Sequence, residues 1–209
     1  MKVQHAALVA FVSLSSTLIA GSDADRPISS PPPAEFSPMT GYERLGRYVT
    51  GLGNPQALFL AAASAGIGQA NGTPKEWGGG AEGYGLRIGD AFTKHVIRDT
   101  LTFGISATLH EDNRYFVSRD TGVFRRTKYA LKSTFLARHD DGSQSFSFSR
   151  IGGAAGSAFV SRAWQPYSKT TAGDGAVTFG FAMMSDIGFN VFREFWPDLK
   201  RHFHKGPIQ

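Results

Sequence analysis

Small residues recur at intervals of four along stretches that otherwise favour helix, and this spacing restricts the possible folds more than any other feature. Glycine inside a helix costs up to about 1 kcal/mol relative to alanine, so repeated glycines need a compensating contact. Small side chains four residues apart form a ridge that lets a neighbouring helix approach closely. We therefore predict closely packed helices, with contacts at Ala81, Gly85, Gly89, Gly152 and Gly156.

Helix-start signals and apolar periodicity divide the chain into about five helices. Asn54 followed by Pro55 is a helix start, because the asparagine side chain can accept a bond from a free backbone NH while proline has none to satisfy. The uncharged run 56–70 follows, and the longest helix is expected to end in the polar cluster 110–114. Further helices are expected within 124–138, 149–164 and 176–203. The sequence thus predicts an all-α fold, a bundle of about five helices.

An alternation of residue types keeps one other fold open. Odd positions from Val177 to Val191 are largely apolar and even positions are small or polar, which is typical of a strand in a barrel. The same run also fits a helical stripe through Phe181, Met184 and Phe195. Because the chain has few hairpin-turn signals, we favour helices and retain a small outer-membrane β-barrel as the alternative.

The N-terminal residues have the form of a secretory signal peptide. Lys2 precedes an apolar run, and the small residues Ser22 and Ala24 suit cleavage after residue 24. Residues 25–50 include a proline-rich segment, which we predict to be a largely disordered linker. The chain has no cysteine, so an exported form holds together by packing without disulfides. The predicted organisation is a signal peptide (1–24), a linker (25–50) and one helical domain (51–209), exported to the periplasm or the outer membrane.

Three blocks of the sequence resemble an uncharacterised group of exported bacterial envelope proteins. The blocks are HEDNRYF (110–116), ARHDDGSQSFSFSRIGG (137–153) and FREFWPDLKR (192–201), which contains EFWPD. The resemblance implies an exported, envelope-associated protein. It implies no activity and identifies no functional residue.

A basic amphipathic helix is expected after the turn at 119–122. Apolar residues on one side of this helix are opposed by a basic face that consists of Arg125, Arg126, Lys128, Lys132 and Arg138. This face suits an anionic membrane surface or an envelope protein partner. The alternative is a solvated face of a bundle helix, and export makes nucleic acid an unsuitable partner.

The cluster His110, Glu111 and Asp112 supplies the weak catalytic candidates. Adjacent residues on a helix point about 100° apart, so these three cannot jointly hold one metal ion. A serine hydrolase would need Ser149 or Ser161, and neither lies in a nucleophile-elbow pattern. We therefore predict no metal, no cofactor and no catalytic site, and interpret the cluster as a helix terminus joined by ion pairs.

One carboxylate, Asp186, lies in an otherwise apolar run and needs a polar partner if it is buried. We expect a structural ion pair there.

Together these features favour a non-enzymatic structural or interaction protein of the cell envelope that binds a membrane surface through the basic helix. The alternatives are a β-barrel pore and a metal-dependent or serine hydrolase that uses the His110 cluster.

Overall fold

A computed structural model describes residues 36–204, and the predicted signal peptide lies outside the described residues. Within that range the chain is helical, with one small sheet and no barrel, so the all-α prediction is confirmed and the barrel alternative is wrong. The main elements are α1 (Gly41–Leu52), α2 (Pro55–Ala70), α3 (Gly80–Leu109), β1 (Glu111–Asp112), α4 (Val123–Phe135), β2 (Leu136–His139), β3 (Gln144–Phe146), α5 (Phe148–Val160) and α6 (Ala172–His204).

The predicted linker over residues 25–50 is too long, because the chain forms helix α1 from Gly41 onward. The helix begins after a capping box, in which the Thr40 hydroxyl accepts from the Glu43 NH at 3.2 Å and the Glu43 carboxylate accepts from the Thr40 NH at 2.9 Å. Both bonds satisfy NH groups that the first turn leaves without partners. Residues 41–50 are therefore part of the folded domain.

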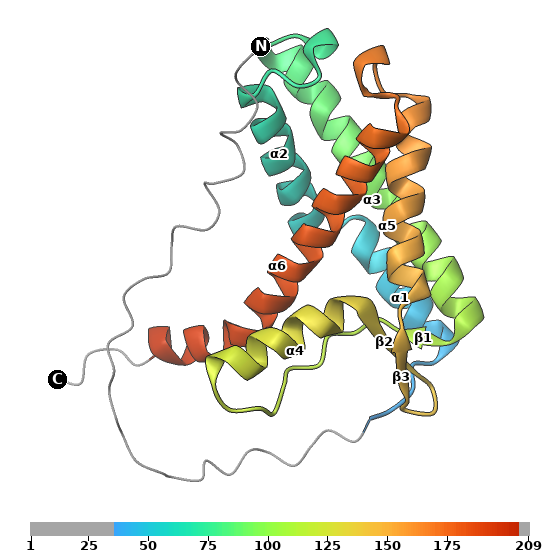
Figure 1. The fold of residues 1–209 in the computed structure, drawn as a ribbon, viewed down its shortest axis with the longest axis vertical. Coiled ribbons are helices and arrows are strands. Elements are labelled where there is room, and N and C mark those ends of the chain that lie inside the picture. The colour runs from blue at the N-terminus through green and yellow to red at the C-terminus, as the bar shows by residue number, and fades with distance from the viewer. Residues whose placement is uncertain (1–35, 205–209) are drawn as a thin grey trace, which may run out of the picture. The chain divides into compact units, whose positions relative to one another are not determined.

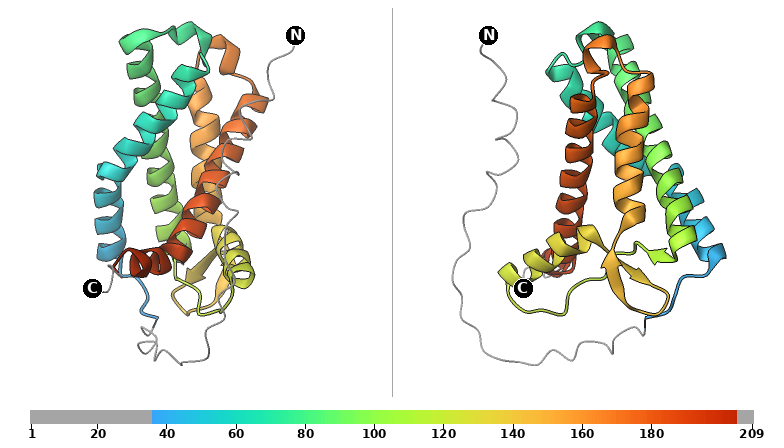
Figure 2. Two further views of the ribbon diagram at one scale, coloured as in Figure 1. Left: turned by 90° about the vertical axis from the view of Figure 1, so that its left-hand side faces the viewer. Right: turned by 45° about the vertical axis from the view of Figure 1, so that its right-hand side comes forward.

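Helix α3 is the central element of the bundle (Figure 1). It packs against α1, α2 and α5, while α6 packs against both α5 and α4. Helix α4 lies across the lower end of the bundle, and the last turns of α6 turn aside to run near it (Figure 2). Pro197 lies in these last turns and lacks the NH that would bond to the preceding turn, which is a common cause of a bend.

The small antiparallel sheet joins the end of α3 to the start of α5. Its strand order is β1-β2-β3, with Glu111 opposite His139 and Leu136 opposite Phe146. Residues 140–143 form the turn between β2 and β3, where the Asp141 carboxylate accepts from the Ser143 NH at 2.9 Å. The sheet thus fixes β1 beside the N-terminus of α5.

The predicted small-residue contacts divide into two groups. Gly152 and Gly156 lie at the contact of α5 with α3, where an added methyl group would meet Ile105 and Leu101. Their neighbour Gly153 is closer still, because a Cβ there would overlap Thr102 Oγ1 and lie 2.8 Å from the Arg98 carbonyl oxygen. These glycines have the close approach that their spacing predicts.

The prediction is wrong for Gly85 and Gly89. A Cβ at either position would meet no described atom within 4 Å, and Ala81 is exposed. These residues lie on the side of α3 away from its neighbours. The glycine of this stretch that does make a close approach is Gly83, where a Cβ would meet the Gly78 carbonyl oxygen at 2.6 Å.

Burial is inverted relative to a water-soluble bundle. The buried apolar residues are mainly alanines, and the largest fully buried side chains are Glu111, Glu194, Thr134, Asp112, Ser147, Ser149 and Ser161. Large apolar side chains face outward instead, including Phe59 (71% exposed), Phe124 (82%) and Phe181 (60%). Soluble proteins normally bury their large apolar side chains and expose their charged ones. An extended apolar exterior of this kind marks a surface that contacts a membrane or another protein.

Helix α6 shows the inversion most clearly. Its exposed apolar side chains form one stripe in two sets, each spaced three or four residues apart, and the second set begins eight residues after the first ends. The stripe consists of Val177, Phe181 and Met184, followed by Phe192, Trp196, Leu199 and Phe203. The helix is long and apolar enough to cross a membrane, and 17% of its most apolar window is buried. The stripe therefore faces away from the protein interior.

Candidate functional site

The polar cluster after α3 is built around Glu111, a fully buried carboxylate on β1. One carboxylate oxygen accepts from the Phe148 NH at 3.0 Å, and the other accepts from the Ser149 NH at 2.9 Å and the Ser149 hydroxyl at 2.5 Å. The Ser147 hydroxyl lies 3.3 Å from the second oxygen. These donors are at the N-terminus of α5, where free NH groups and the helix dipole favour a negative charge. Glu111 is therefore the cap of α5.

Arg150, the third residue of α5, donates hydrogen bonds to the C-terminus of another helix, α4. Its guanidinium donates to the carbonyl oxygens of Ser133 at 2.5 Å and Thr134 at 2.8 Å, at the C-terminus of α4. It also donates to the Asn113 carbonyl oxygen at 3.1 Å. The last carbonyls of a helix lack intrahelical donors, so a cation there is favourable. Arg150 thus ties α4 and the chain after β1 to the start of α5.

The second buried carboxylate, Glu194 of α6, binds the loop after β1 and helix α4. It accepts from the Tyr115 hydroxyl at 2.7 Å, the Ser118 NH at 2.9 Å and Arg126 Nε at 2.9 Å. Burial raises the pKa of Tyr115, and the hydrogen bond to Glu194 and its charge raise that pKa further. The tyrosine is therefore a fixed donor to Glu194, and Arg126 also pairs with Asp198 at 2.5 Å.

These contacts bring together the three sequence blocks that carry the resemblance. Glu111 belongs to the first block, Ser149 and Arg150 belong to the second, and Glu194 belongs to the third. Sequence reasoning missed Glu194 and Arg150 because nothing in their local context marks a helix cap or a buried pair. It placed Glu111 at a helix terminus, but the structure pairs this residue with the start of α5 and not with an arginine.

The three catalytic candidates are not arranged for catalysis. His110 is exposed and ends α3 in a left-handed conformation (φ 53°), while Glu111 and Asp112 are buried. Asp112 accepts from Arg114 Nε at 2.7 Å and so is held in an ion pair. The hydroxyls of Ser149 and Ser161 are fully buried, where they cannot meet a substrate. Within residues 36–204 no group of three or more acidic or histidine residues could hold a metal ion.

The predicted basic face is divided by the fold. Arg126 is turned inward to Glu194, and Arg138 lies on β2 over the rings of Phe36 and Phe116. Arg125, Lys128 and Lys132 remain exposed on α4. The prediction of one continuous face of five basic residues is therefore wrong.

Asp186 has the structural partner that its apolar context requires. Its carboxylate pairs with Arg98 of α3, and the two side chains are 19% and 22% exposed. Lys94 pairs with Asp90 at 2.6 Å one turn earlier on the same helix. These four charges are thus neutralised in pairs within the bundle.

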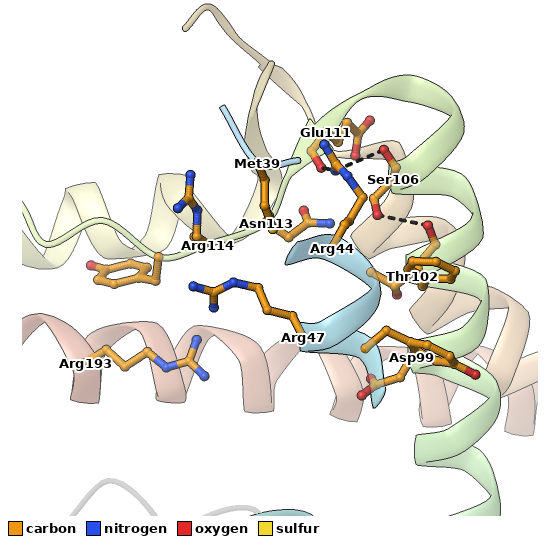
Figure 3. A pocket seen from close by; sticks show the side chains of 13 residues that line it. Met39, Arg44, Arg47, Asp99, Thr102, Ser106, Glu111, Asn113, Arg114 and Arg193 are labelled. Carbon is orange, nitrogen blue, oxygen red and sulfur yellow. Dashed lines mark hydrogen bonds between the residues drawn. The ribbon is translucent and has the colours of Figure 1, made fainter. Parts of the chain in front are cut away.

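A cavity of about 500 Å³ lies between α1, α3, the segment after β1 and α6. Four arginines line it, namely Arg44, Arg47, Arg114 and Arg193, and Figure 3 shows three of their guanidinium groups, those of Arg47, Arg114 and Arg193, on one side of the space. Arg44 is buried and donates to the carbonyl oxygens of Ser106 and Glu111. The cavity lining contains four arginines, and no sequence motif marked it because they come from three separate segments.

No protein family, curated protein or solved structure matches this chain. The likeness of the three blocks to an exported group therefore stays a prediction. The function has to be inferred from the arrangement of the chain's own residues.

Proposed function

We propose that this protein is an exported structural or interaction protein of the cell envelope whose helical body is anchored in a membrane through its apolar outer faces. The observation that carries the proposal is the exposed stripe of α6. A long apolar helix in the core of a soluble protein is mostly buried by its neighbours, whereas 17% of this apolar window is buried. The stripe therefore needs an apolar environment outside the chain.

The free energy involved is comparable with the stability of a domain. Fully burying one large apolar side chain contributes roughly 1.5–3 kcal/mol, so four side chains of α6 that are 50–62% exposed have roughly 3–7 kcal/mol to gain from burial of their remaining surface. The four are Val177 and Phe181, each 60% exposed, Met184, 62% exposed, and Phe192, 50% exposed. A lipid hydrocarbon layer supplies this burial without a specific partner.

The length of the helices supports a membrane position. At 1.5 Å per residue, the 30 residues of α3 extend about 45 Å and the 33 residues of α6 about 50 Å. The hydrocarbon core of a bilayer is about 30 Å thick, so both helices exceed it. Such a position also suits the pairing of Arg98 with Asp186, because charges in a membrane bundle face its interior and neutralise one another.

Helix α4 supplies a surface-binding element beside this anchor. Phe124, Leu131 and Phe135 are exposed on it, and Lys128 and Lys132 are exposed among them. Aromatic and apolar residues mixed with lysines suit the boundary between lipid head groups and acyl chains, where the lysine ammonium groups reach anionic phosphates. We include an anionic lipid surface as the partner of this helix.

Extraction of cell membranes with alkaline carbonate tests the anchor. We expect the wild-type protein to remain in the membrane pellet and to need detergent for release. The double variant Phe181→Asp, Met184→Asp places two carboxylates in the stripe and should move most of the protein to the soluble fraction. The matched control, Gln56→Asp with Gln144→Asp, adds two carboxylates and makes the same change in net charge at exposed positions outside α6, and should stay in the pellet.

Two outcomes would contradict the proposal. One is a wild-type protein that carbonate releases and that stays monomeric in water. The other is a water-soluble dimer in which a second copy covers the stripe, shown by cross-linking between cysteines placed at Phe181 in two chains.

A further inference from the structure

We propose that the arginine-lined cavity binds a phosphate group. This inference goes beyond the proposed function, because a phosphate site can be measured whether or not α6 lies in a membrane. It rests on the positions and bonding of Arg47, Arg114 and Arg193 around the cavity (Figure 3).

Two of the three guanidinium groups form no ion pair. Among the residues that the structure describes, the side chains of Arg47 and Arg193 form no hydrogen bond or ion pair, and both residues are exposed. The nearest acidic residue along α1 is Glu43, whose pKa is lowered by its hydrogen bonds from Thr40 and then by the charges of Arg114 and Arg47, without a direct bond to Arg47. Ten donor N–H groups on these two arginines are thus available to a ligand.

The third guanidinium is held in place beside them. Arg114 is fixed by Asp112 through Nε at 2.7 Å and donates to the Ser37 carbonyl oxygen at 2.8 Å. A positive charge that is fixed in this way loses little freedom when a ligand binds. Arg114 therefore adds a preorganised positive edge to the site.

The acidic residues of the lining do not neutralise this charge. The Glu111 carboxylate faces α5 and accepts from Ser149, and Asp99 lies 3.6 Å from His95. Arg44 pairs with Asp140 at 3.6 Å and Arg114 pairs with Asp112, so among the described residues the arginines of the lining without an ion pair are Arg47 and Arg193. An anion in the cavity would supply the partner that these two guanidinium groups lack.

The chemistry of the donors selects phosphate within the class of anions. Planar guanidinium groups bind phosphate oxygens in pairs, and a tetrahedral phosphate can accept from three directions at once. The cavity also has apolar and aromatic lining from Met39, Tyr48 and Phe103, and Tyr48 stacks on Phe103 at 4.7 Å. Its volume of about 500 Å³ admits a phosphate that carries an organic group. The source is either free phosphate or a lipid head group.

Calorimetric titration of the purified full-length protein in a nonionic detergent and phosphate-free buffer tests the site. The probes are inorganic phosphate and dihexanoyl phosphatidic acid below its micellar concentration. Binding of both probes assigns the site to the phosphate group itself, and binding of the lipid alone assigns it to a lipid head group. The double variant Arg47→Gln, Arg193→Gln should weaken binding at least tenfold, since it removes charge-assisted bonds to the ligand.

A charge-matched control separates a built site from general attraction. Lys75→Gln with Arg119→Gln removes two exposed positive charges outside the cavity and outside α4, and should leave the affinity unchanged within a factor of about two. The conservative variant Arg193→Lys keeps the charge but loses the paired donors, and should bind several-fold more weakly than the wild type. Circular dichroism checks that each variant is folded, and if the double variant is not, Arg193→Lys decides.

The proposal is overturned by any of three results. These are no saturable binding of either probe, equal affinity of the folded Arg47/Arg193 variants and the wild type, or an equal loss of affinity in the Lys75/Arg119 control.

Discussion

The substitution Glu111→Gln tests the central structural role assigned to this buried carboxylate. The wild-type carboxylate accepts from two backbone NH groups and two hydroxyls at the start of α5. Glutamine keeps one acceptor oxygen and turns an NH₂ group toward donors, so about half of these bonds are lost. At about 1.5–3 kcal/mol for each hydrogen bond to a charged group, the free energy of unfolding should fall by about 3–6 kcal/mol.

The assay is thermal unfolding in detergent, followed by circular dichroism at the helix band. A change of 1 kcal/mol shifts the Tm of a domain of this size by about 2–4 °C, so the variant should unfold at least about 6 °C below the wild type. The control Asp120→Asn removes one carboxylate from an exposed loop residue and should change the free energy by no more than about 0.5 kcal/mol. A Tm for Glu111→Gln equal to that of the control would refute the capping role.

A second variant, at Ser149, tests whether Glu111 acts through its hydrogen bonds at the start of α5 or only through its negative charge. Ser149→Ala removes the hydroxyl that donates to Glu111 at 2.5 Å. Because the two residues share one bond, the double variant should lose less stability than the sum of the single variants. Strict additivity would show that the two side chains act separately.

Four further substitutions test the packing and the caps. Gly153→Ala should destabilise the fold by about 1–3 kcal/mol because its Cβ would overlap α3. Gly85→Ala has open space around it and should stabilise the fold by up to about 1 kcal/mol. The Tm should therefore fall in the first variant and rise in the second. Arg150→Met should cost about 2–5 kcal/mol, because the carbonyl oxygens of α4 lose their buried donor, and should lower the Tm with little change in helix content. Asn54→Ala should cost about 1 kcal/mol through loss of the 2.7 Å bond to the Ala57 NH, and an unchanged Tm would contradict it.

Local chemistry made part of the fold predictable. The helix start at Asn54 and Pro55 is confirmed because a cap depends on residues adjacent in the sequence. The start of α1 carried a signal of the same kind, Thr40 with Glu43 three residues later, and the proline-rich composition before it obscured that signal. The alternation of apolar and polar residues in α6 suggested a strand, but the structure has a helix there. Several of the same apolar residues also fit the helical spacing and form the exposed stripe.

Contacts between distant segments set the limit of sequence reasoning. A four-residue spacing marks one face of a helix but not which neighbour covers it, so Gly85 and Gly152 looked alike although Gly152 alone of the two meets another helix. Likewise, the charge of Arg126 suggested a surface position until the fold placed Glu194 beside it. The cavity was invisible for the same reason, since its arginines converge only in three dimensions.

The turn between β2 and β3 has a consequence for the continuity of the chain. It lies in the linear sequence between α4 and α5, yet the contacts of Glu111 with Ser149 and of α3 with α5 join the two sides independently of it. A chain opened between Asp141 and Gly142 therefore consists of two fragments that still complete each other's helix ends. Expressed as separate polypeptides, residues 1–141 and 142–209 should reassemble, whereas a break within α5 would divide the helix that packs against α3.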